Sequence, residues 1–143
     1  YQDTNMIEIK TLQYDEENEI HLGIRFDNKT CSSYIEIYVE TNVFTNFAKE
    51  LIDFPFGQSN TVRFQYGEDD DKWAYYLLIT VGVFDQSGNI LIKTLVDNKG
   101  DATYHYRCEF PIITDVATVN ELGKQLVKWM PIENETWVFP ADK

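Results

Sequence analysis

Disulfide bonds and metal sites can contribute little to the stability of this protein. Its 143 residues include only two cysteines, Cys31 and Cys108, and these show no CxxC or other metal-ligand spacing. Two isolated, part-buried thiols are the expected state. The sequence leaves open whether they form a single disulfide, because it does not give their separation in space.

Long apolar runs and basic residues are also scarce. No run of about 18 apolar residues exists, so we expect no membrane-spanning helix. Lys and Arg total 12 against 24 Asp and Glu, a formal net charge of −12, which repels phosphate backbones and anionic lipid heads. The charge therefore predicts neither nucleic acid nor membrane as a partner. It would attract a basic protein, although acidity can also serve solubility alone.

Motifs that identify catalytic, nucleotide or metal sites are missing from the sequence. His21 and His105 fall on the predicted solvent-facing sides of strands, and neither has a nucleophile beside it in the sequence. The seven glycines are dispersed and form no phosphate-binding loop. The acidic segments 68–71 and 97–101 do not follow the calcium-loop pattern, and Lys99 would place a cation among the ligands. We therefore predict a protein that is not an enzyme, with no catalytic residue, no cofactor and no metal.

Apolar and aromatic residues are abundant instead. They make up 43% and 15% of the chain, enough for an aromatic-rich core in one domain spanning residues 1–143. The first residue is Tyr1 rather than Met, so the sequence leaves open whether a leader peptide was removed. Oligomeric state is not predicted.

The longest apolar run is KWAYYLLITVGVFD, residues 72–85. Its β-branched and aromatic residues favour a strand over a helix. Read with period two, both of its sides are largely apolar, which predicts a long central strand covered on each face. Leu77 and Ile79 should be almost fully buried in it.

Alternating and helical patterns flank this strand. Period two predicts strands near residues 6–14, 20–26, 33–41, 62–66, 90–97 and 103–110, the last ended by Pro111. Period 3.6 predicts a helix of about three turns from Asn42 to Phe54 and a second from Thr114 or Asp115 to Pro131, with Val127 and Met130 on its apolar stripe. Residues 133–143 should dock through Trp137, Val138 and Phe139. The predicted fold is α+β: a mostly antiparallel curved sheet of about seven strands with two amphipathic helices, one between strands three and four and one C-terminal.

One predicted strand face combines rings and carboxylates. Tyr34, Glu36, Tyr38 and Glu40 alternate opposite an apolar face that already accounts for core packing. Aromatics are enriched in protein interfaces and carboxylates select a basic partner. We interpret this stripe as a candidate partner-binding site, aided by the loop carboxylates Asp69, Asp70 and Asp71. The alternative interpretation is that a helix covers these tyrosines and leaves only their hydroxyls exposed.

The order of these elements resembles a known protein family. Three opening strands, a helix on VFTNFAKELIDFP with its Phe54-Pro55 step, a strand on NTVRFQYGE, the long strand and a closing helix on VNELGKQLVKWM are similar to small bacterial immunity proteins of polymorphic toxin systems, in particular those guarding against wall-associated toxins. The resemblance covers nearly the whole chain. It implies a cytoplasmic, non-enzymatic protein that binds a cognate toxin domain and blocks it, and it transfers no functional residue position by position.

Two functions of different classes follow as expectations. The first is an immunity protein that neutralises a cognate bacterial toxin by occluding its active surface. The alternative is an extracytoplasmic ligand- or carbohydrate-binding β-rich module, in which exposed Trp and Tyr side chains would serve as stacking platforms.

Overall fold

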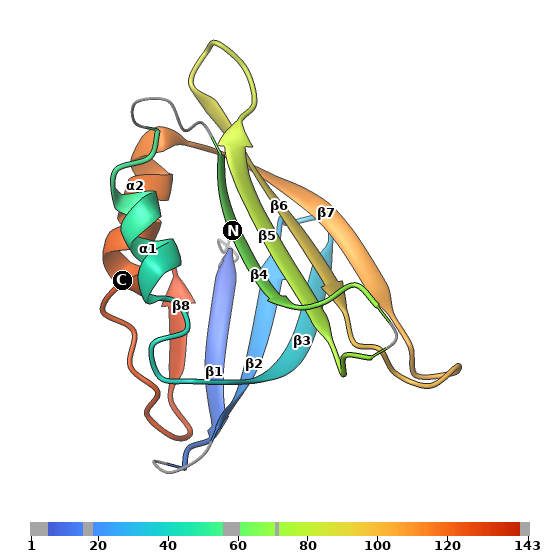
Figure 1. The fold of residues 1–143 in the computed structure, drawn as a ribbon. Helices are drawn as coiled ribbons and strands as arrows, with labels where there is room; N and C mark the ends of the chain where they lie inside the picture. The colour runs from blue at the N-terminus through green and yellow to red at the C-terminus, as the bar shows by residue number, and fades with distance from the viewer. Residues whose placement is uncertain (1–5, 16–18, 56–60, 71, 141–143) are drawn as a thin grey trace.

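Two four-stranded antiparallel sheets and a pair of helices make up the fold (Figure 1). The structure is a computed structural model that describes residues 6–15, 19–55, 61–70 and 72–140. The first sheet has the order β3-β2-β1-β8 and the second the order β4-β5-β6-β7. The elements are β1 Ile7–Gln13, β2 Ile20–Asp27, β3 Ser32–Val39, α1 Thr45–Ile52, β4 Thr61–Gly67, β5 Tyr76–Val83, β6 Asn89–Asp97, β7 Arg107–Asp115, α2 Val116–Leu126 and β8 Thr136–Phe139.

The α+β class with antiparallel pairing is confirmed. The strands, however, divide into two sheets instead of forming one, and the tail supplies a strand that period two did not identify. β8 pairs with β1, with Trp137 opposite Ile9 and Phe139 opposite Ile7. A core cluster of apolar side chains from both sheets and both helices lies between these layers.

The central strand β5 is shorter than predicted. It covers Tyr76–Val83 rather than residues 72–85, because its pairing with β4 ends at Gly67 opposite Tyr76 and its pairing with β6 ends at the same residue. Leu77 and Ile79 are buried as predicted. The prediction that both faces of this strand are covered is wrong, since alternate residues such as Leu78 are only half-buried.

Pro111 lies inside β7 and does not end the strand. It pairs with Lys93 of β6, and β7 continues to Asp115. β7 is at the edge of its sheet, where a residue without an N–H is tolerated. The predicted strand start near Thr103 is also wrong, because β7 begins at Arg107.

The two helices pack on each other beside β8 and β4 (Figure 1). α1 has eight residues and begins after Phe44 without a side-chain cap, so Asn42 is not its cap and the predicted three turns are too many. Asp115 does cap α2, accepting a hydrogen bond from the Thr118 N–H at 2.7 Å. A Cβ on Gly123 would lie 2.7 Å from both the Ala48 carbonyl oxygen and the Ile52 nitrogen, so this glycine permits close approach of the helices.

The apolar stripe of α2 is shorter than the sequence indicated. Val119, Leu122 and Leu126 are buried, but α2 ends at Leu126. Val127 and Met130 therefore leave the helical repeat and are exposed.

Candidate functional site

The predicted stripe lies on the outer face of β3. Its inward neighbours Ile35, Ile37 and Val39 are fully buried, so strand alternation turns Tyr34, Glu36 and Tyr38 outward. Tyr38 remains 47% exposed and the Glu36 side chain 48% exposed. The alternative that a helix covers these tyrosines is therefore wrong. Glu40 is also exposed but lies one residue beyond the end of the strand.

Tyr34 lies across the neighbouring strand β2, over Gly23. A Cβ on Gly23 would overlap the Tyr34 hydroxyl, so the ring takes the space that any other residue at position 23 would fill. The Arg25 guanidinium carbon lies 5.2 Å from the centre of the Tyr34 ring, a cation–π contact. The Tyr34 hydroxyl donates to Glu36 Oε2 at 3.2 Å. Burial, followed by the nearby Glu36 charge, raises the pKa of Tyr34 to about 12.

His21 completes this face from β2. Its Nε2 lies 2.8 Å from Glu36 Oε1, and its ring stacks on that of Tyr38, with centroids 4.5 Å apart and planes inclined by 12°. We call His21, Arg25, Tyr34, Glu36 and Tyr38 the β2–β3 patch. Glu36 is thus held from two sides, by Tyr34 and His21, while half of its side chain stays exposed.

Two tyrosines, each one residue before a strand of the second sheet, form hydrogen bonds with the open edge of β3. The Tyr75 hydroxyl donates to the Tyr38 carbonyl at 3.0 Å and accepts from the Tyr38 N–H at 3.3 Å. The Tyr106 hydroxyl donates to the Tyr34 carbonyl. Burial raises the pKa of both Tyr75 and Tyr106, and the Glu36 charge adds to the rise at Tyr106. The backbone beneath the patch is therefore fixed, which favours a rigid surface.

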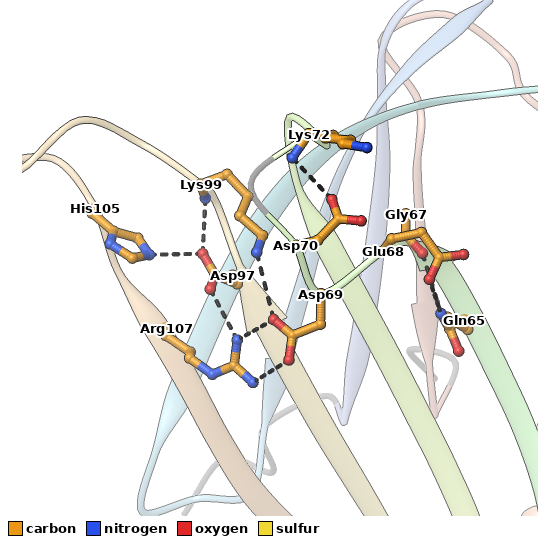
Figure 2. Close-up of polar contacts among 10 residues, drawn as sticks. All are labelled: Gln65, Gly67, Glu68, Asp69, Asp70, Lys72, Asp97, Lys99, His105 and Arg107. Carbon is orange, nitrogen blue, oxygen red and sulfur yellow. Dashed lines mark hydrogen bonds and ion pairs between the residues drawn. The ribbon is translucent and has the colours of Figure 1, made fainter.

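The acidic loop between β4 and β5 makes contacts of a different kind (Figure 2). Arg107 holds Asp69 with two hydrogen bonds, Nη1 to Oδ1 at 2.8 Å and Nη2 to Oδ2 at 3.1 Å, and Lys99 Nζ lies 3.5 Å from Oδ1. The Arg107 hydrogen bond lowers the pKa of Asp69. Asp70 accepts from the Lys72 N–H at 2.9 Å. Asp71 lies outside the described residues.

Arg107 is shared with a buried carboxylate, Asp97, whose side chain is 4% exposed. Asp97 accepts from Arg107 Nη1 at 3.0 Å and from the Lys99 N–H at 2.8 Å, and it lies 2.8 Å from His105 Nε2 (Figure 2). Burial raises the pKa of Asp97, but these hydrogen bonds outweigh it and the pKa is lowered. We call Asp69, Asp97, Lys99, His105 and Arg107 the ion cluster.

The structure therefore separates the predicted site residues into two groups. Tyr34, Glu36 and Tyr38 form one connected surface, whereas Asp69 is engaged by the ion cluster and its charge is offset by Arg107 and Lys99. The sequence pattern alone did not identify His21 and Arg25 as members of the patch, or Gly23 as the residue that Tyr34 covers. Their signal was the β2–β3 register, which places His21 opposite Tyr38 and Arg25 opposite Tyr34.

Within residues 6–15, 19–55, 61–70 and 72–140, no three His, Cys, Asp or Glu side chains are placed to hold a metal ion. A mostly apolar hollow of about 360 Å³ lies between α2 and β8, lined by Ala117, Thr118, Glu121, Gln125, Phe139 and Pro140. Neither helix of the described chain is long and apolar enough to cross a bilayer.

Comparisons with known proteins give one distant neighbour. No family model matches the chain, and no curated protein matches it. Among solved structures, the crystal structure of WHY3 from Arabidopsis thaliana has a TM-score of 0.46 at 12% identity, with 86% of this chain and 82% of that chain covered. A similarity at this level assigns neither a function nor a partner to the chain.

One prediction from the sequence is corrected. Nucleic acid was excluded as a partner on the ground of net charge, and this exclusion no longer stands. The exclusion used the charge of the whole chain. That total does not describe the field over a single face, where cations such as Arg25 lie among the rings of the patch.

Proposed function

We propose that this chain is a non-enzymatic binding protein of the immunity type. Its β2–β3 patch would dock on a basic region of a cognate bacterial toxin domain and occlude the toxin's active surface. The observation that carries the proposal is Glu36, a carboxylate oriented by Tyr34 and His21 but still half exposed beside the ring of Tyr38. A Lys or Arg side chain is the complementary ligand for such a group.

Rigidity of the patch supports this role. Interface side chains that are already ordered lose little conformational entropy on binding, so more of the contact energy appears as affinity. Tyr38 is held by the His21 ring on its side chain and by Tyr75 on its backbone. The net charge of −12 adds long-range attraction for a basic partner, which speeds association.

Asp69 has no part in this proposal. Its charge is offset within the ion cluster, so long-range attraction of a basic partner is left to groups such as Asp70 and Glu36.

The test is co-expression with a toxin encoded next to the gene, followed by measurement of toxin neutralisation and of binding kinetics. Tyr38→Ala should weaken binding about thirtyfold through faster dissociation, since a central aromatic anchor contributes about 2 kcal/mol. The matched control is Tyr104→Ala, which removes a tyrosine that is 80% exposed and lies outside the patch. It should leave affinity unchanged.

Charge is tested with a second matched pair. Glu36→Gln keeps the shape of the side chain and should slow association and reduce its salt dependence. Glu109→Gln, at an exposed position of β7, should do so much less. A gene neighbourhood without any toxin, or equal effects of Tyr38→Ala and Tyr104→Ala, would refute the proposal. Binding of an oligosaccharide that depends on Tyr38 would favour the carbohydrate-binding alternative instead.

A further inference from the structure

The two sheets meet at a seam between the edge strands β3 and β7. Two hydrogen bonds cross this seam: Asn28 Nδ2 donates to the Pro111 carbonyl at 2.8 Å, and the Tyr106 hydroxyl donates to the Tyr34 carbonyl. Residue 28 thus lies by residue 111, and residue 34 by residue 106. The segments 28–34 and 106–111 therefore run antiparallel to each other along the seam.

Cys31 and Cys108 occupy the middle of these two segments. Cys31 lies halfway between Asn28 and Tyr34, and Cys108 lies between Tyr106 and Pro111. Since each segment is pinned near both of its ends, the antiparallel order places the two cysteines opposite each other across the seam.

The two thiols differ in exposure. Cys108 is two residues before the buried Phe110 and packs against the core. Cys31 is two residues before Ser33, the first buried residue of β3. Cys31 lies one residue before the start of β3 and is exposed, so it is the accessible member of the pair, whereas the half-buried Cys108 is the inner member.

Asn28 connects Cys31 directly to β7. Its Oδ1 accepts from the Cys31 N–H at 2.7 Å, and its backbone N–H donates to the Cys31 carbonyl at 3.0 Å. The same side chain donates through Nδ2 to Pro111. The nearness of the two thiols is felt electrostatically as well: burial raises the pKa of Cys108, and negative charge at Cys31 raises it further.

We propose that Cys31 and Cys108 form a thiol–disulfide site that closes across the seam. Both are free thiols in this structure, with Cys31 exposed and Cys108 half-buried. Cys31 is therefore the point of entry for an oxidant, and Cys108 is the resolving thiol. This inference is independent of the proposed function.

The oxidant is a low-molecular-weight disulfide such as oxidised glutathione. The Cys31 thiolate attacks one sulfur of the small disulfide, forms a mixed disulfide and releases one small thiol. The Cys108 thiolate then attacks the Cys31 sulfur, and the second small thiol leaves. The protein loses two protons and two electrons, and the small disulfide gains them. The product joins the two sheets covalently and closes a loop of more than half the chain.

The test is equilibration of the purified chain with oxidised and reduced glutathione, followed by alkylation and intact-mass and peptide analysis. The expected product is a monomer that has lost two hydrogens, carries no alkyl group and yields a peptide pair joined at Cys31 and Cys108. At a fixed glutathione ratio, the fraction oxidised relative to reduced should fall about a hundredfold in strong urea, because unfolding separates the two thiols. The oxidised form should have a urea midpoint higher by about 1 M or more.

Single-cysteine variants provide the controls. Cys108→Ala should stop at the mixed disulfide on Cys31, and Cys31→Ser should react slowly because the remaining thiol is half-buried. Asn28→Ala should lower the oxidised fraction, because it frees Cys31 from β7. The proposal is overturned if the unchanged chain stops at the mixed disulfide, forms a dimer through Cys31, remains unoxidised, or oxidises as readily in urea as in buffer.

Discussion

The β2–β3 patch and the ion cluster are built from the same kinds of residue but serve different purposes. Both combine a carboxylate with a cation and at least one aromatic or imidazole ring. In the cluster the central carboxylate, Asp97, is buried and binds three donors. In the patch the central carboxylate, Glu36, keeps half its surface exposed. A saturated carboxylate stabilises the fold, whereas an exposed, oriented one has capacity left for a partner.

Both regions rest on one apolar core, so Leu77→Ala, which disrupts that core, should have the largest effect. Leu77 is fully buried in β5, so its truncation should cost about 2–5 kcal/mol of the free energy of unfolding. Urea denaturation followed by tyrosine fluorescence and by circular dichroism measures it. A single shared midpoint is expected, and separate midpoints would mean that the two sheets unfold independently.

Asp97→Asn should have the next largest effect. The amide keeps the shape but loses the charge that Arg107 and His105 contact, so the free energy of unfolding should fall by about 2 kcal/mol. Asp70→Asn is the control, because Asp70 accepts from the exposed Lys72 N–H and lies outside the cluster. It should change stability by no more than about 0.5 kcal/mol. Equal losses from the two variants would remove the distinction between a saturated and a solvated carboxylate.

Acid should weaken the ion cluster. The pKa values of Asp69 and Asp97 are lowered in the folded chain, so the unfolded chain takes up protons first. Their contribution to stability is therefore complete above the unfolded value of about 4 and is lost as pH falls through the folded values. Urea midpoints between pH 7 and pH 2 measure this decline, which should be shallower in Asp97→Asn.

Tyr38→Ala should have only a small effect on stability. Tyr38 is half exposed, and its backbone bonds to Tyr75 do not need its side chain. Loss of the stack on His21 should cost no more than about 1 kcal/mol, and Tyr38→Phe, which keeps the ring, still less. Thermal unfolding measures both. A loss comparable to that of Leu77→Ala would make Tyr38 a core residue and end its role as an interface candidate.

Local pattern was sufficient for much of the fold and for part of the patch. Alternation identified β1 to β3 and turned Tyr34 and Tyr38 outward, because period two follows from strand geometry alone. It overextended β5 at residues 72–75, since the end of a strand depends on where its partners end. It also ended β7 at Pro111, because a proline is excluded from a central strand but not from an edge, and edge position is a property of the sheet.

Contacts between distant segments could not be read from the sequence. Asp69 and Arg107 are 38 positions apart, and β1 pairs with a strand at the other end of the chain. The sequence of the acidic run at residues 68–71 therefore indicates exposed, unpaired carboxylates, although Arg107 forms an ion pair with one of them, Asp69. His21 and Arg25 joined the patch only through the β2–β3 register.

Pro111 also bears on how copies of this chain behave when crowded together. Its carbonyl faces the first sheet and is taken by Asn28, and an N–H on that side is missing because the residue is proline. On the opposing edge, Tyr75 occupies both the N–H and the carbonyl of Tyr38. A strand from another molecule would thus meet an interrupted row of donors and acceptors on either side of the seam. Such interruptions discourage edge-to-edge aggregation in a chain of 43% hydrophobic residues.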